Sequence, residues 1–219
     1  MPTLSPEELR VLGCLIEKSQ ATPEYYPMTL NALVAACNQK TSRDPVVEYQ
    51  AGEVEEALSG LREKGWCAFV HGEGRVVKYA HRAGASGMGL SNAQMAALSL
   101  LLLRGPQTAG EIKSRALRQH EFKTLEEVAE TLASLQNREP PLVAAVARQP
   151  GQKEERYRHC LGDPRQPREA TASSAPGSWR AELAELKATL ARLQEENAQW
   201  RERLARLEED FARLRNDLS

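Results

Sequence analysis

Basic side chains on and between predicted helices and hairpins are the residues of this 219-residue sequence that could contact a phosphate backbone. Lysine and arginine neutralise phosphates and release the counterions around them, so each contact strengthens binding most at low salt. In the first half of the chain, the candidates precede the third predicted helix or lie on the first hairpin. In the second half, they lie on and after the second predicted helix. The candidate residues are Lys40, Arg43, Arg75, Lys78, Lys113, Arg115, Arg118 and Lys123.

The charge balance limits this hypothesis. The net charge is −1, and residues 1–165 contain as many basic as acidic side chains, whereas nucleic-acid-binding domains usually carry a local basic excess. The third predicted helix of each half also begins with acids, which are Glu53, Glu55, Glu56 and Glu126, Glu127, Glu130. Carboxylates there would face phosphates, although acids are also favoured in a first helical turn. A basic surface must therefore come from segregation of charge.

Catalytic and metal chemistry have little support in the sequence. Four histidines and four cysteines show no ligand spacing: His71, His81, His120, His159, Cys14, Cys37, Cys67 and Cys160. The glycine-rich stretch at 84–89 lacks the Lys-Ser/Thr ending of a phosphate-binding loop. We expect no catalytic residue, no metal and no cofactor. Cysteine usage predicts a reduced, cytoplasmic protein without disulfides, and the absence of a signal peptide or long apolar run predicts no membrane association.

A unit of roughly 80 residues occurs twice in the sequence, and its predicted helices and hairpins position the basic side chains. In the first copy, a helical stretch at 53–61 ends at Lys64-Gly65 and is followed by two short strands at 66–70 and 76–80. The second copy has a helical stretch at 127–135 and a strand at 142–147. The hairpins end alike, in Lys78-Tyr79-Ala80-His81 and Arg156-Tyr157-Arg158-His159.

Each copy also contains two earlier helices. Ser5, Thr29, Ser91 and Thr108 are placed to cap them, and Thr124 with Glu127 predicts a capping box for the third helix of the second copy. Three helices followed by a two-stranded hairpin is the order of a winged helix-turn-helix. The predicted fold class is therefore α+β, mainly α with small β-hairpins, in two tandem winged helix-turn-helix domains. The predicted boundaries are 1–83 and 90–162 for the domains, with a linker at 84–89.

The C-terminal stretch predicts a flexible tether at 163–178 and a coiled-coil helix at 179–219. Its apolar positions alternate steps of four and three, and the seam consists of Leu183, Leu186, Leu190, Leu193, Asn197, Trp200, Leu204, Leu207, Phe211 and Leu214. The flanking charges are attractive across a parallel pair, and a lone Asn at an a position favours a parallel dimer. The alternatives are an antiparallel coil and a helix folded back on its own domains.

Several short motifs of the chain are specific. They include Gly13-Cys-Leu-Ile-Glu-Lys, Leu30-Asn-Ala-Leu and Ala36-Cys-Asn-Gln-Lys-Thr, followed by Arg43 and Pro45. The second half adds Leu101-Leu-Leu-Arg-Gly and His120-Glu-Phe. Together these motifs resemble those of the YceH family, and the resemblance extends from Leu4 to Leu161. It implies a bacterial protein built from two winged helices, in a family whose function is not established.

Two functions from different classes fit these observations. The first is a dimeric DNA-binding protein, similar to a transcription regulator, that contacts DNA through its wings and the basic surfaces of its second helices. The alternative is a protein–protein adaptor, in which the winged helices bind a protein partner and the coil forms a homodimer. The acids of the third helices favour the alternative.

Overall fold

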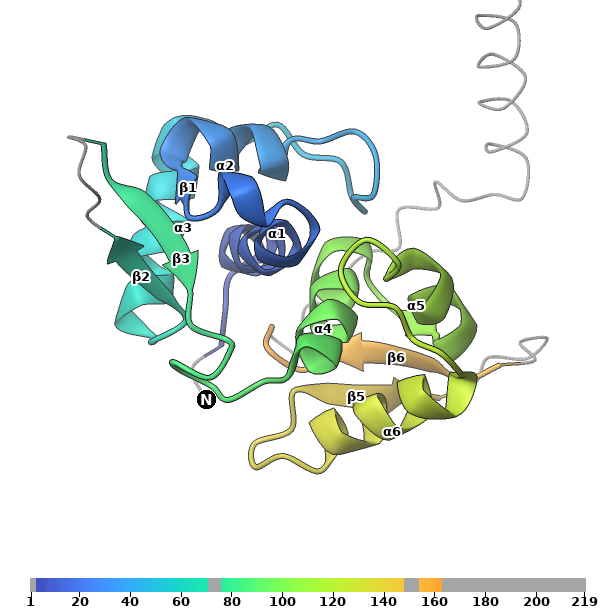
Figure 1. The fold of residues 1–219 in the computed structure, drawn as a ribbon. Coiled ribbons are helices and arrows are strands. Elements are labelled where there is room, and N and C mark those ends of the chain that lie inside the picture. The colour runs from blue at the N-terminus through green and yellow to red at the C-terminus, as the bar shows by residue number, and fades with distance from the viewer. Residues whose placement is uncertain (1–2, 71–75, 148–153, 163–219) are drawn as a thin grey trace, which may run out of the picture. The chain divides into compact units, whose positions relative to one another are not determined.

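The first half of the chain contains three α-helices and a small antiparallel sheet (Figure 1). The computed structural model describes residues 3–70, 76–147 and 154–162. The elements of the first half are α1 (Pro6–Ala21), the 3₁₀ turn η1 (Pro23–Tyr25), β1 (Met28–Thr29), α2 (Leu30–Cys37), α3 (Ala51–Glu63), β2 (Cys67–Val70) and β3 (Lys78–His81). The strand order is β1-β3-β2, so the short strand before α2 joins the hairpin that follows α3.

The second half repeats this order. Its elements are α4 (Asn92–Arg104), β4 (Gln107–Thr108), α5 (Ala109–Arg115), α6 (Leu125–Gln136), β5 (Val143–Val146) and β6 (Arg156–His159). The strand order is β4-β6-β5. Even the register is repeated, because Thr29 pairs with Lys78 and Thr108 pairs with Arg156. The described residues thus form an α+β structure with six α-helices and two three-stranded antiparallel sheets.

The helix starts follow the capping signals. The Ser5 hydroxyl accepts from the backbone N–H of Glu8, and the Glu8 carboxylate accepts from the backbone N–H of Ser5. Thr29, Ser91 and Thr108 cap the next helices as expected. These bonds satisfy N–H groups that a first helical turn leaves without partners.

Four local features differ from the sequence prediction. Strands β1 and β4 were not expected, because two residues are too few to show a strand pattern. Helix α5 ends at Arg115, so Arg118 follows the helix. Thr124 caps α6, but the Glu127 carboxylate bonds the backbone N–H of Lys123 and does not complete a capping box. The glycine-rich segment 84–89 is a hydrogen-bonded turn, in which the N–H groups of Gly87 and Gly89 both donate to the Gly84 carbonyl.

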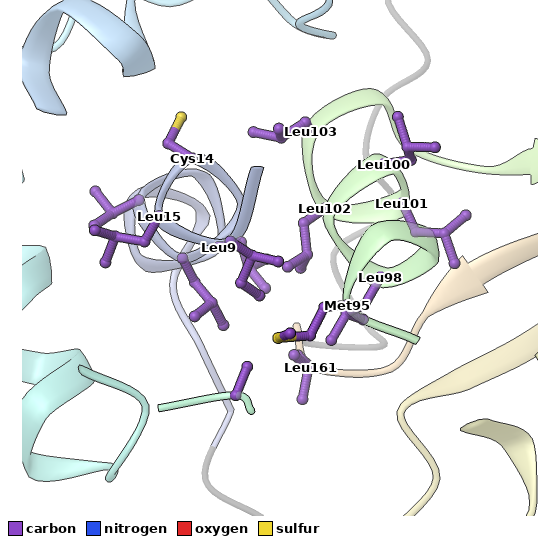
Figure 2. Packing of buried hydrophobic residues seen from close by; sticks show 14 of the residues in the cluster. Leu9, Cys14, Leu15, Met95, Leu98, Leu100, Leu101, Leu102, Leu103 and Leu161 are labelled. Carbon is purple, nitrogen blue, oxygen red and sulfur yellow. The ribbon is translucent and has the colours of Figure 1, made fainter. Parts of the chain in front are cut away.

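Helices α1 and α4 pack side by side and join the two halves in one core (Figures 1 and 2). Leu9 of α1 and Leu102 of α4 lie between the two helices in Figure 2. The approach is close at Gly13, where a Cβ atom would lie 2.9 Å from the Leu103 Cδ2 atom. Two backbone bonds also cross between the halves, from Leu4 N to Leu161 O and from Asp44 N to Leu103 O, each 2.8 Å long. The described residues accordingly belong to one compact unit, residues 1–167.

The predicted tether and coiled-coil helix, residues 163–219, lie outside the described residues, as does the whole dimerisation seam. Among the described helices, none combines the length and apolar character needed to cross a membrane.

Candidate nucleic-acid interface

Arg43 lies inside the protein, although the sequence placed it among the phosphate contacts. Its side chain is fully buried and pairs with the Glu17 carboxylate in α1 through two parallel bonds of 3.1 and 2.6 Å. Its remaining N–H groups donate to the carbonyls of Ala36 and Ser42 and to the Gln39 side chain. A guanidinium has five N–H donors, and all of them are used here. Arg43 therefore fixes the loop between α2 and α3 to α1 and has no donor left for a phosphate.

Arg10 holds the same loop at Cys37 and Pro45, and the sequence analysis did not identify it. Only 2% of Arg10 is exposed, and its guanidinium donates to the carbonyls of Cys37 and Pro45. Burial lowers the pKa of Arg10. The helical spacing of Arg10, Cys14 and Glu17 places all three on one face of α1, and that spacing is the signal that could have identified this polar face.

The other first-half candidates are exposed or outside the described residues. Lys40 is exposed in the turn after α2, and Lys78 is exposed on the central strand β3. In the described part of the chain, neither amine has a hydrogen bond or ion pair, so both are available to an external anion. Arg75, at the tip of the first hairpin, lies outside the described residues.

The structure brings Lys113 and Lys123 together. The Lys113 amine donates to the Lys123 carbonyl over 2.8 Å, which links α5 to the segment before α6. The first turn of α6 lies at the same place, because Glu127 accepts from the Lys123 N–H and contacts His120. These two donors hold the pKa of Glu127 below its usual value. The basic pair therefore lies beside ionised carboxylates.

Arg115 faces the sheet. It bonds the Gln107 side chain and approaches the Glu111 carboxylate at 3.6 Å, while Arg156 of β6 contacts the other Glu111 oxygen at 3.1 Å. Glu111 thus joins α5 to the second hairpin through Arg156. The sequence reading missed Arg156 as a partner, although its register position matches that of Lys78.

Arg118 is exposed in the turn after α5 and has no hydrogen bond or ion pair within the described part of the chain. Beside it in sequence, Leu117 is 64% exposed, and Leu125 at the start of α6 is 50% exposed. The turn and the start of α6 therefore present basic and apolar side chains, together with the exposed acids of α6.

The acids at the start of the third helices are exposed as expected, except for Glu127, which is half-buried. In α3 these are Glu53, Glu55 and Glu56, and in α6 they are Glu126 and Glu130. Glu53 bonds the backbone N–H of Gln50 and so has a capping role. The backbone N–H of Glu126 and the Thr124 hydroxyl lower the pKa of Glu126. The exposed faces of α3 and α6 thus carry acidic side chains, which oppose phosphates.

A serine–histidine pair occurs at the end of β3, but its proton is on the wrong atom for catalysis. His81 Nε2 lies 2.8 Å from the Ser19 hydroxyl, while Nδ1 accepts the backbone N–H of Ala83 over 3.2 Å. The proton therefore resides on Nε2, which donates to Ser19, whereas a general base must accept from its nucleophile. The Ser19 hydroxyl in turn donates to the Ile16 carbonyl. The arrangement ties β3 to α1.

Among the described residues, no group of three or more His, Cys, Asp or Glu side chains is placed to hold a metal ion. The four cysteines are free thiols, and Cys14, Cys37 and Cys67 are buried.

Comparison with known proteins gives a consistent family assignment. A family described as "Protein of unknown function, DUF480" matches residues 4–152. A UPF0502 protein of Koribacter versatilis is 46% identical over 193 residues, covering 87% of this chain and 90% of that protein. A UPF0502 protein of Opitutus terrae is 51% identical over 164 residues, covering 74% and 71%. One from Geobacter sulfurreducens is 51% identical over 162 residues, covering 74% of each.

Proposed function

We propose that this chain, which belongs to the bacterial UPF0502 family, also known as the YceH family, is a non-enzymatic tandem winged-helix protein that binds DNA as a dimer. The observation that carries the proposal is the repeated topology of three helices with a three-stranded sheet, in which the strand before α2 or α5 pairs with the hairpin after α3 or α6. A winged helix of this kind presents a helix and a hairpin to DNA together.

The proposed contacts lie on the first hairpin, in the turn after α2, and on and after α5. Lys40, Lys78, Arg118 and Lys123 have exposed side chains with no partner in the described part of the chain, and Lys113 has one bond, to a carbonyl. Arg43 is left out because its donors are used inside the protein. Arg115 contributes less, since Gln107 and Glu111 already hold it. The acids of α3 and α6 favour contacts to the phosphate backbone over reading of bases by these helices.

A salt series of gel-shift assays tests this proposal. The full chain should shift random genomic DNA at low salt and release it at moderate salt, because counterion release makes affinity fall with salt. Replacing Lys113, Arg118 and Lys123 by Gln should weaken binding and reduce the slope of log K against log salt by about one per lost phosphate contact. Arg82→Gln, an exposed arginine outside the proposed contacts, is the matched control. If the full chain gives no shift at low salt, the proposal of DNA binding is wrong.

The second candidate is a protein–protein adaptor. It is supported by the exposed acids of α3 and α6 and by the exposed Leu117 and Leu125 next to Arg118. Apolar side chains surrounded by charges are typical of protein contact surfaces. In this case a Leu117→Ser, Leu125→Ser variant should lose a co-purifying protein partner that an Arg82→Gln control retains, while neither chain shifts DNA.

A further inference from the structure

Cys14 of α1 and Cys37 of α2 form a contact pair in the core of the first half. Both residues have 0% exposure. The Cys14 thiol lies 3.4 Å from the carbonyl of Ala36, the residue immediately before Cys37, and the two cysteine side chains are themselves hydrogen-bonded. In Figure 2 the Cys14 side chain leaves α1 away from Leu9, which lies on the side of α1 that faces α4. The pair therefore belongs to the contact between α1 and α2.

Two buried guanidinium groups flank this pair. Arg43 is neutralised by Glu17, but Arg10 contacts only carbonyl oxygens, and its Nε atom has no partner in the described part of the chain. A buried cation without a carboxylate is costly unless negative charge develops nearby. The groups that act electrostatically on Arg10 in this direction are Cys14, Tyr49 and Cys37.

The two thiols differ in their readiness to ionise. Burial raises the pKa of Cys14, but the hydrogen bond from Cys37 and the charges of Arg43 and Arg10 outweigh it and bring that pKa below the ordinary value. The hydrogen bond to Cys14, together with burial, raises the pKa of Cys37. The thiolate is the nucleophile in thiol oxidation, so these directions favour Cys14 as the attacking sulfur and Cys37 as the resolving one.

We propose that Cys14 and Cys37 are a redox pair that peroxides convert into a disulfide between α1 and α2. The Cys14 thiolate attacks one peroxide oxygen, the O–O bond breaks, and hydroxide leaves to be protonated to water, so that Cys14 becomes a sulfenic acid. The Cys37 sulfur then displaces the hydroxyl group of that sulfenic acid, and the Cys37 proton leaves with it as a second water. In sum, two thiols are oxidised and one hydrogen peroxide is reduced to two waters.

Burial gives the pair selectivity for the oxidant. Bulky thiol reagents cannot reach side chains with no exposed surface, whereas hydrogen peroxide needs only a small local opening. Arg10 and Arg43 hold the α2–α3 loop against α1 beside the pair. Half-exposed Cys160 provides the internal contrast, because it is accessible to large reagents and burial raises its pKa.

The test uses the full chain with Cys67→Ser and Cys160→Ser, which retains only the proposed pair, and circular dichroism verifies that it is folded. The native protein is treated with hydrogen peroxide and then denatured and alkylated. Alkylation should then detect neither thiol, and a non-reducing digest should contain a cross-linked Cys14–Cys37 peptide. Dithiothreitol should restore both thiols. The same native protein should resist a bulky maleimide.

A second variant with Cys37→Ser in the same background separates the two roles. It should give no cross-link, and Cys14 should be labelled by a sulfenic-acid reagent after peroxide treatment. Retention of both thiols in the native double variant, or a cross-link that forms only in denaturant, would overturn the proposal. The assigned roles would be overturned if the sulfenic-acid reagent labels Cys37 in a Cys14→Ser variant but does not label Cys14 in the Cys37→Ser variant.

Discussion

At the scale of single residues, the sequence predicted the chemistry of the basic side chains better than it predicted which of them are exposed. Arg43 precedes a third helix, as a phosphate-binding arginine would, yet it is the most fully bonded cation of the described residues. The sequence could not show this, because its partner Glu17 lies 26 residues earlier, in helix α1. Lys40 and Lys78 have the exposure that the sequence implied.

Replacement of Arg43 by Met should destabilise the protein by about 3–5 kcal/mol, because it removes one partner of a buried ion pair and leaves the Glu17 carboxylate uncompensated. Urea unfolding of the variant and the parent would measure the difference. The control is Arg118→Met, an exposed arginine whose replacement should change stability by about 0.5 kcal/mol or less. Equal stabilities of the two variants would contradict the structural role of Arg43.

His81 should make stability depend on pH. Burial lowers the pKa of His81 from 6.5 to about 4, so between these values the unfolded chain binds a proton that the folded chain does not. The contribution of His81 to the free energy of unfolding is therefore fully present above pH 6.5. As the pH falls towards 4, the free energy of unfolding decreases by about 3 kcal/mol. Unfolding free energies measured over this range should fall more steeply for the parent than for His81→Gln. Parallel curves would show that His81 titrates normally in the fold.

At the scale of elements, local signals predicted helix starts and ends, but pairing between distant segments had to come from the structure. Ser5, Thr29, Ser91 and Thr108 cap helices as their motifs predict. Gly65 and Gly105 stop helices with φ values of 78° and 75°. Strands β1 and β4 exist only because the later hairpins supply their partners.

The sequence indicates that helix α4 is buried but does not show which element covers it. The apolar run Leu98–Leu103 includes more than one helix face, and every residue from Met95 to Leu103 is buried. A helix that is apolar all round is covered on more than one side. The sequence contains that signal, but it does not identify α1 of the other half as the cover.

Close packing of α1 on α4 predicts opposite effects for two glycine substitutions. Gly13→Ala should destabilise the protein by on the order of 1 kcal/mol or more, because the new Cβ would meet Leu103 at 2.9 Å and Leu102 at 3.1 Å. Gly52→Ala in α3 meets nothing within 4 Å and should be neutral or stabilising by up to about 1 kcal/mol, since Ala favours helix. Thermal unfolding of both variants would check the signs, and a stabilising Gly13→Ala would contradict the close packing.

At the scale of the whole molecule, the two repeats share one core. The backbone bonds Leu4–Leu161 and Asp44–Leu103 and the packing of α1 on α4 tie the first repeat to the second. The hairpins and basic turns of both repeats are therefore carried by one body.

Dimerisation is the remaining whole-molecule prediction, and it rests on the heptad pattern of residues 179–219 in the sequence. Leu190→Asp places a charge at an a position of the seam and should dissociate the dimer, because an unpaired carboxylate is costly in an apolar contact. Ala188→Asp, at the outward f position, should leave the dimer intact. Sedimentation equilibrium of the full chain would give the masses. If the parent is a dimer and Leu190→Asp leaves its mass unchanged, the dimer contact lies outside this seam. If the parent is a monomer, the coil has no part in the proposed DNA binding.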